Sequence, residues 1–342
     1  MIDTARRRLL GGLVAGALAA HGAASGATTA AAVDVHLDDA LAGYGFPPPH
    51  PFGTWRGPAF EQAARRAGLL ANCARPATRL ATRAELLRFH TPAHVDLVVT
   101  ALPAERPFLD DGDTPVVAGL HAHAAAVVGA ALVGLERVLR GDAQRSLQPI
   151  GGLHHAARDK AAGFCVYNDV GVVIETLRRV HGFARVAYVD IDAHHGDGVF
   201  YAFLQDPGVI IADLHQDGRT LFPGSGRADE RGAGEAVGTK LNVELAPRSG
   251  DAEFLKAWPA VEAHLEAHAP QFFLLQCGAD GLAGDPLAQL EYTSAVHVHV
   301  TRRLRALAAR HAQGRLMCLG GGGYVADNLA HAWCAVLLEL LA

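Results

Sequence analysis

The stretch RVAYVDIDAHHGDG, from Arg185 to Gly198, runs from a block of apolar residues directly into a group of carboxylates and imidazoles. Its first half, 185–191, is apolar at both sets of alternating positions, which predicts a β-strand buried on both faces. Such a strand needs a layer of helices on each side, so the segment indicates a parallel sheet in an α/β protein. The polar half begins where that strand should end.

Other short, β-rich runs are bounded by glycine, proline or polar residues, and they predict further buried strands at 209–214, 272–276 and 316–319. Amphipathic or alanine-rich segments predict helices over 57–70, 84–89, 94–100, 116–139 and 167–180. Strands that alternate with helices in this way predict one α/β domain, with a central parallel sheet and helices on both of its faces.

The composition narrows the class of protein. Half of the 342 residues are hydrophobic and 19% are charged, which is typical of a compact globular chain and not of a disordered one. The formal net charge of -5 argues against direct binding of nucleic acid, which needs a basic surface. The five cysteines are scattered without a CxxC pair, and we interpret them as free buried thiols. Histidines that alternate with apolar residues are interpreted as ordinary helix or surface residues: His121, His123, His297 and His299.

Two of the predicted strands end in metal-binding residue types. Asp190, Asp192 and His194 follow the strand at 185–191, and Asp280 comes four residues after the run 272–276. In extended chain the first three side chains point the same way, so two can hold a cation while the third lies one step deeper. With Asp280 they form two carboxylates and one imidazole, a set that suits catalytic Zn²⁺ or Fe²⁺. The competing interpretation is a hydrogen-bonded turn, which the Gly-Ala-Asp motif on a second strand disfavours.

Two further motifs supply proton-transfer groups. His154 and His155 follow a glycine pair that lets backbone approach a site closely, and Asp190 and Asp197 are available to orient the two imidazoles. Tyr324 follows a run of four glycines at 320–323. A divalent metal, two oriented histidines and a tyrosine are the groups needed for metal-assisted hydrolysis of an unactivated amide.

The order of these motifs resembles that of a known family, the histone deacetylase superfamily of zinc-dependent acyl-amide hydrolases. The resemblance rests on segments 151–169 (with GFCVYND at 163–169), 188–203, 221–226 (LFPGSG), 275–285 and 320–324. It spans roughly 34–340 and includes Pro49-His50-Pro51 with Arg56, and Asp113-Thr114-Pro115. It implies a single-domain arginase-deacetylase fold. It also implies hydrolysis of N-acyl, notably acetyl, amides on lysine-like or polyamine-like amines, releasing acetate and free amine.

The resemblance also implies roles for individual residues. Asp192, His194 and Asp280 match the metal ligands. His155 with Asp197 matches the general base and acid, and His154 with Asp190 matches the second histidine, which acts mainly electrostatically. Tyr324 matches the hydroxyl that polarises the amide carbonyl and stabilises the oxyanion.

Substrate and potassium positions come from the same resemblance. Gly163, Phe164 and Phe222 match the walls of a narrow tunnel for an acyl-lysine-like chain, and Asp113 matches the acid at its rim. Without the resemblance, the two phenylalanines would be interpreted as core, and Asp113 as part of a solvated acidic loop with Asp110 and Asp111. A structural K⁺ is expected at Asp190, Asp192, His194, Asp213 and Leu214. Asp213 departs from the serine more usual in the family.

Two alternatives are kept open. One is a dinuclear, arginase-like hydrolase on the same fold, although His154 and His155 stand where further carboxylate ligands would be needed. The other is an acyl-lysine or metabolite binding protein with a vestigial site, although every catalytic position holds a competent residue. The sequence leaves the substrate open between protein lysine, polyamine and longer acyl amides, and it leaves the oligomeric state open.

The N-terminus has the pattern of an export signal. Arg6-Arg7-Arg8 precedes the apolar run 9–20 and the small residues 22–27. This pattern predicts either a twin-arginine signal in 1–27, which would place the protein in the periplasm, or a disordered extension on a cytoplasmic protein. We expect residues 1–32 to be such an extension, residues 33–342 to form the deacetylase catalytic domain, and no other segment to span a membrane.

Overall fold

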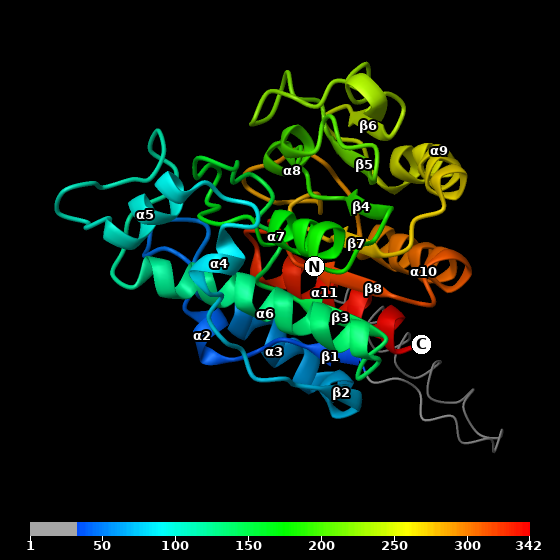
Figure 1. Cartoon of the computed structure of the whole chain (residues 1–342). Helices are drawn as coiled ribbons and strands as arrows, with labels where there is room; N and C mark the ends of the chain where they lie inside the picture. Colours follow the sequence, from blue (N-terminus) through cyan, green and yellow to red (C-terminus); the bar gives the residue numbers. More distant parts are fainter. Residues whose placement is uncertain (1–32) are drawn as a thin grey trace.

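The computed structural model describes residues 33–342 and contains one eight-stranded, parallel sheet in the order β2-β1-β3-β8-β7-β4-β5-β6 (Figure 1). Its strands are β1 (Val33–Val35), β2 (Cys73–Ala74), β3 (Arg145–Gln148), β4 (Val186–Asp190), β5 (Val209–Gln216), β6 (Lys240–Leu245), β7 (Phe273–Gln276) and β8 (Leu316–Leu319). This is the α/β architecture with a central parallel sheet that the apolar runs predict.

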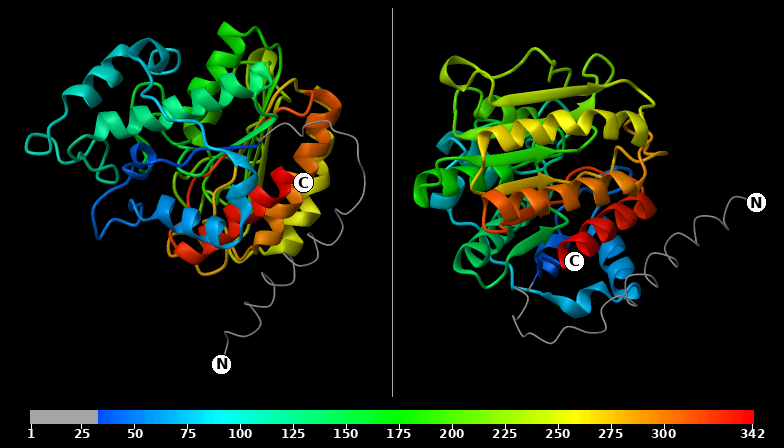
Figure 2. Two further views of the ribbon diagram at one scale, coloured as in Figure 1. Left: turned by 90° about the horizontal axis from the view of Figure 1, so that it is seen from below. Right: turned by 90° about the vertical axis from the view of Figure 1, so that its right-hand side faces the viewer.

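Helices cover the sheet on both sides, as Figure 2 shows. One layer holds α6 and α7, and the opposite layer holds α3, α9, α10 and α11. The helices are α2 (Asp39–Ala42), α3 (Arg56–Arg66), η1 (Leu69–Asn72), α4 (Arg83–Leu86), α5 (Pro92–Thr100), α6 (Leu120–Arg140), α7 (Asp169–Glu175), η2 (Thr176–Val180), α8 (Asp197–Ala202), η3 (Gly234–Ala236), α9 (Asp251–His268), α10 (Ser294–His311) and α11 (Ala326–Leu341).

Strand β4 shows why its sequence is apolar throughout. Val186 and Tyr188 point into the core beneath α6 and α7, whereas Ala187 and Val189 point into the core beneath the other layer. All of these side chains are fully buried. Successive strand residues face opposite sides of a sheet, so a strand covered twice has no solvent-facing position. Asp190, the last residue of β4, is equally buried and carries the first charge.

The predicted elements agree with the structure in position, with shifts at their ends. The strand at 316–319 is confirmed, and those at 185–191, 209–214 and 272–276 differ by one or two residues. The helix predicted over 116–139 begins instead at Leu120, because Gly119 before it is left-handed (φ 74°). The helix predicted over 57–70 ends at Arg66, and that over 167–180 becomes a π-helix from Thr176. Strands β1, β2, β3 and β6 were not predicted.

The twin-arginine signal predicted in 1–27, and the extension predicted in 1–32, lie outside the described residues. Within 33–342, α6 is the one helix long and apolar enough to cross a membrane by length and composition. The most apolar window of α6 has a mean hydropathy of 1.5, and 67% of it is buried inside the fold. Its apolar side chains therefore pack in the core between the sheet and the helix layer that holds α6 and α7.

Candidate active site

The sheet order gathers the predicted motifs at one edge. Strands β3, β8, β7 and β4 are consecutive neighbours in the sheet, although they are far apart in the chain. Parallel strands present their carboxyl ends at the same edge, where open α/β sheets bind their ligands. His154 and His155 follow β3, Tyr324 follows β8, Asp280 follows β7, and Asp192 and His194 follow β4.

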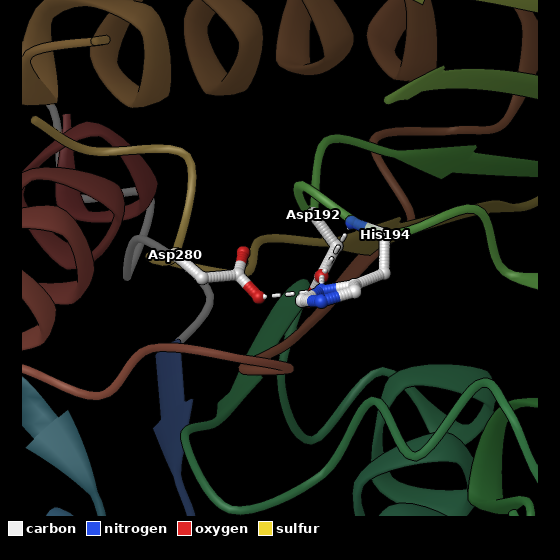
Figure 3. A group of neighbouring side chains, drawn as sticks. All are labelled: Asp192, His194 and Asp280. Carbon is white, nitrogen blue, oxygen red and sulfur yellow. Dashed lines mark hydrogen bonds and ion pairs between the residues drawn. The ribbon is translucent and has the colours of Figure 1, made fainter. Parts of the chain in front are cut away.

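Asp192, His194 and Asp280 form a buried group whose ligand atoms face one another (Figure 3). His194 Nδ1 lies 3.1 Å from Asp192 Oδ1 and 3.0 Å from Asp280 Oδ2, and each residue offers a ligand atom within 4.8 Å of the others. Among residues 33–342, this is the only such group of His, Cys, Asp or Glu side chains.

The donor set fits a divalent cation. The other oxygens of the two carboxylates are already occupied: Asp192 Oδ2 accepts hydrogen bonds from Gln276 Nε2 and the Gly322 N–H, both at 2.7 Å, and Asp280 Oδ1 accepts from the Ala193 N–H. Two buried carboxylate oxygens and one imidazole nitrogen therefore remain pointed at the same space. Burial disfavours a charged imidazole, but the hydrogen bonds to Asp192 and Asp280 outweigh it and raise the pKa of His194 to about 10. The site attracts positive charge.

The turn after β4 departs from the expectation of extended chain. The strand ends at Asp190, and residues 192–194 form bends. Each aspartate accepts a hydrogen bond from the backbone two residues later, Asp190 Oδ1 from the Asp192 N–H and Asp192 Oδ1 from the His194 N–H, both at 3.0 Å. The carboxylates themselves thus shape the turn that brings Asp192 and His194 together.

Each of the two adjacent histidines is paired with its own carboxylate. His154 Nδ1 lies 2.7 Å from Asp190 Oδ2, and His155 Nδ1 lies 2.7 Å from Asp197 Oδ1. The two Nε2 atoms are 3.1 Å apart, so one of these nitrogens donates a hydrogen bond and the other accepts it. Asp190 also accepts a hydrogen bond from the buried Tyr188 hydroxyl.

The surroundings give the two imidazoles opposite proton affinities. Burial would lower the pKa of His154, but the negative charges of Asp190 and Asp192 raise it to about 10. Burial, together with the positive charge of His154, lowers the pKa of His155 to about 4 against the weaker effect of Asp197. At neutral pH, His154 therefore carries a proton on both nitrogens, and the unprotonated Nε2 of His155 accepts the hydrogen bond from His154 Nε2.

Tyr324 follows a glycine turn that is hydrogen-bonded to the metal group, which is formed by Asp192, His194 and Asp280. Beside the Gly322 contact with Asp192, the Tyr324 N–H donates to Asp285 Oδ2 at 3.0 Å. The buried guanidinium of Arg56 donates to the carbonyls of Gly321 and Gly323. A Cβ on Gly322 would lie 2.0 Å from Asp280 Oδ2, so only glycine allows this close approach.

The predicted substrate residues lie in front of this group. The Phe222 ring is 45% exposed and its centre is 5.0 Å from that of His155. The Phe164 ring centre is 5.9 Å from that of Tyr324. A Cβ on Gly163 would lie 2.6 Å from the His155 ring and 3.0 Å from the Phe222 ring, which places this glycine between the two walls.

The acidic loop divides its aspartates between two roles. Asp110 Oδ1 accepts hydrogen bonds from the N–H groups of Gly112, Asp113 and Thr114, so its carboxylate holds the loop together. Asp111 and Asp113 are exposed, and the Asp113 carbonyl lies 3.1 Å from His50 Nε2. The loop therefore presents exposed carboxylates but has an ordered hydrogen-bonded base.

The residues predicted to hold potassium are all buried. Asp213 pairs with Asp190 across β4 and β5. One carboxylate oxygen of Asp213 accepts from the Gly196 N–H at 2.9 Å, and the other lies 2.7 Å from His215 Nδ1. This histidine also donates from Nε2 to the Gly226 carbonyl, and its pKa is raised because Asp213 outweighs the effect of burial.

The contacts of two residues near the metal group were not predicted from the sequence. Gln276 donates to Asp192 and accepts from the Gly278 N–H, so it joins β7 to a predicted metal ligand. His297 is fully buried in α10 and lies 2.8 Å from the Gly278 carbonyl, in the turn that leads to Asp280. His297 is thus a helix residue, as interpreted, but it is buried and not on the surface, because periodicity alone does not show which loop a helix packs against.

The parallel sheet, the buried Asp–His–Asp group and the paired histidines define a metal-dependent amide hydrolase. The histone deacetylase domain model matches residues 50–340, and the chain therefore belongs to the histone deacetylase family. The acetoin utilization protein AcuC of Bacillus subtilis (strain 168) is 37% identical over 271 residues, which cover 77% of this chain and 70% of that protein. Histone deacetylase 6 of Arabidopsis thaliana is 35% identical over 266 residues, covering 75% of this chain and 55% of that protein.

A solved structure gives the same assignment for the fold. The crystal structure of the HDA15 HD domain superposes with a TM-score of 0.82 at 26% sequence identity, covering 91% of this chain and 88% of that one. Members of the family are deacetylases, so this chain is an enzyme that hydrolyses acyl amides with the help of a catalytic metal.

Proposed function

We propose that the enzyme removes acetyl groups from lysine-like or small linear amines with one zinc ion bound by Asp192, His194 and Asp280. The observation that carries the proposal is the convergence of these three ligand atoms, in a buried site, beside two histidines with opposite proton affinities. Two carboxylates and one imidazole with an open position suit zinc, and Fe²⁺ is the alternative metal. When bound, the metal polarises the amide carbonyl and acidifies the attacking water.

The residues of the chain then divide the proton transfers. His155, neutral at neutral pH, accepts the proton of the attacking water and later delivers it to the amine that leaves. Asp197 holds the imidazole of His155 in the required tautomer. His154 stays protonated beside Asp190 and stabilises negative charge in the transition state. Tyr324 donates its hydroxyl hydrogen bond to the developing oxyanion.

The front of the site suits a single extended chain. Phe164 and Phe222, with Gly163 between them, supply apolar walls for the methylenes of an acylated amine, and their positions beside Tyr324 and His155 support this role. The exposed Asp113 lies on a loop joined to this wall, where it can accept hydrogen bonds from the backbone of a peptide substrate. An acylated lysine or acylated polyamine has the required linear apolar stem.

A structural potassium ion is proposed beside β4 and β5. Asp190, Asp192 and Asp213 bring three buried carboxylates together, and a monovalent cation would offset their mutual repulsion. Within the predicted set, His194 and Leu214 complete the group. The ring of His215 lies against Asp213 and donates from its other nitrogen to the Gly226 carbonyl, so it offsets part of the same repulsion.

One activity screen tests the proposal. Purified protein would be assayed against an acetyl-lysine peptide, acetylated polyamines and longer acyl amides, with the metal content measured on the same sample. We expect turnover of acetyl amides at one zinc or iron per chain. Two tightly bound metals per chain would favour the dinuclear, arginase-like alternative, and absence of turnover by the metal-loaded protein would favour a binding protein with a vestigial site.

A further inference from the structure

The backbone of Phe164 has a conformation that bulky side chains rarely adopt. Its φ is 69°, in the left-handed region, and the preceding Gly163 has a φ of 53°. Glycine adopts this conformation without strain, but phenylalanine does not. A strained residue of this kind persists only where the surrounding contacts hold it in place.

Both polar backbone groups of Phe164 are held by side chains from distant parts of the chain. The Phe164 carbonyl accepts a hydrogen bond of 2.7 Å from the Tyr44 hydroxyl, 120 positions earlier in the sequence. The Phe164 N–H donates to the Thr114 hydroxyl at 3.1 Å, 50 positions away. The Tyr44 hydroxyl also accepts from the Val166 N–H at 3.1 Å, so it spans the backbone on both sides of Cys165.

The two side chains that hold Phe164 are themselves well anchored. Tyr44 is 1% exposed, and its ring packs edge-on against Phe52 at 5.7 Å. Thr114 is fully buried, and its own hydroxyl donates a hydrogen bond to Asp110 Oδ2. A continuous series of donors thus runs from the Phe164 N–H through Thr114 to the Asp110 carboxylate, which also organises the acidic loop.

We infer that Tyr44 and Thr114 are positioning residues that set the place of the Phe164 wall, and through it the fit of the enzyme to a linear alkyl chain. The Phe164 ring lies 5.9 Å from Tyr324 and 4.6 Å from the His50 ring, so a relaxed backbone would move this wall relative to the reacting carbonyl. Neither side chain touches the substrate. The inference rests on the proposed function, because it presupposes that the substrate stem lies against Phe164.

A chain-length series of substrates tests the inference. The acetamides of linear amines from methylamine to pentylamine would be assayed as substrates of the metal-loaded wild type, Tyr44→Phe and Tyr292→Phe. Burial of each methylene against the wall should raise kcat/KM about fourfold in the wild type. In Tyr44→Phe this increment should fall below about twofold, through higher KM for the longer amides, with kcat for the methylamine acetamide retained. Tyr292 is the matched control, because its buried hydroxyl has no hydrogen-bond partner within residues 33–342, and Tyr292→Phe should keep the wild-type increment.

A second pair of variants tests the hydrogen bond between the Phe164 N–H and the Thr114 hydroxyl. Thr114→Val keeps the side-chain shape but loses the hydroxyl, and it should flatten the chain-length series as Tyr44→Phe does. Thr114→Ser keeps the hydroxyl and should restore the wild-type series. Metal content and the thermal midpoint are measured on every variant, so that a loss of fold is separated from a displaced wall.

The outcomes separate the two proposals. If the wild type turns over the series with no dependence on chain length, the substrate stem does not lie against Phe164, and the tunnel assignment fails together with the inference. If the wild type shows the increments and both Tyr44→Phe and Thr114→Val retain them with metal bound, the positioning role is overturned while the proposed function stands.

Discussion

Replacing His154 with glutamine should raise the pKa of His155 and move the acid limb of the pH profile towards neutral pH. The two imidazole rings have their centres 4.1 Å apart, with the Nε2 atoms 3.1 Å from each other. His154 is protonated at neutral pH because its pKa is raised to about 10. Its charge is one of the causes, after burial, that lower the pKa of His155 to about 4. Glutamine removes that charge at similar volume.

The geometry sets the size of the effect. Two unit charges about 4 Å apart interact by about 4 kcal/mol at an effective dielectric constant near 20. At about 1.36 kcal/mol per pKa unit, this corresponds to roughly three units. In the variant, the buried Asp190, which lies 2.7 Å from His154 Nδ1, loses its imidazolium partner. Burial already raises the pKa of Asp190, so this carboxylate takes up a proton more readily, and the loss of its negative charge offsets part of the rise in the pKa of His155. We therefore expect a net rise of about one to two units in the pKa of His155.

The assay is the pH dependence of kcat/KM for an acetyl-lysine peptide, measured with metal-loaded wild type and His154→Gln. A general base must be neutral, so the rate falls as the pH drops through its pKa. In the variant, this acid limb should lie about one to two units higher, with residual turnover on the plateau. The bound metal acts on both proteins, so the difference between the two profiles isolates the charge of His154.

The reasoning is refuted if the acid limb of His154→Gln stays in place or moves to lower pH while the metal is retained. His155→Ala is the companion variant, and it should abolish turnover almost completely with unchanged metal content. If the His154 variant were the less active of the two at every pH, the roles of the two histidines would have to be exchanged.

Four other predictions address the metal, the oxyanion and the potassium site. Asp192→Ala should lose both metal and turnover, because two remaining ligands hold the ion too weakly, and elemental analysis of the purified variant checks this. Gln276→Leu removes a donor to Asp192 and should weaken metal affinity about 10–100-fold in a chelator competition, whereas full affinity would show that this contact does not orient the ligand. Tyr324→Phe should keep fold and metal but reduce kcat about 10²–10³-fold, and near-normal turnover would reassign the phenol to packing. Asp213→Ser should leave His215 without its carboxylate. We expect the thermal midpoint of this variant to depend more on the concentration of KCl than on that of NaCl, and a salt response equal to that of the wild type would contradict the prediction.

Much of this protein could be predicted from its sequence, because the deciding patterns are local in the chain. A run such as 316–319 is apolar at every position, and only a strand or helix buried on all sides accommodates that pattern. The aspartates and histidine after β4 shape their own turn through hydrogen bonds two residues ahead, so the spacing of Asp192 and His194 is sufficient to bring them together. The motif order was also enough to indicate the family.

Only the tertiary structure decided which strands are neighbours and which distant side chains hold the site. Backbone hydrogen bonds between parallel strands are the same for any pair, so the order β3-β8-β7-β4 is set by the packing of helices on both faces. The same packing buries His297 against the turn before Asp280 and brings Tyr44 to Phe164 across 120 positions. These contacts leave no periodic signal, because each depends on one side chain reaching one backbone group after the whole sheet has assembled.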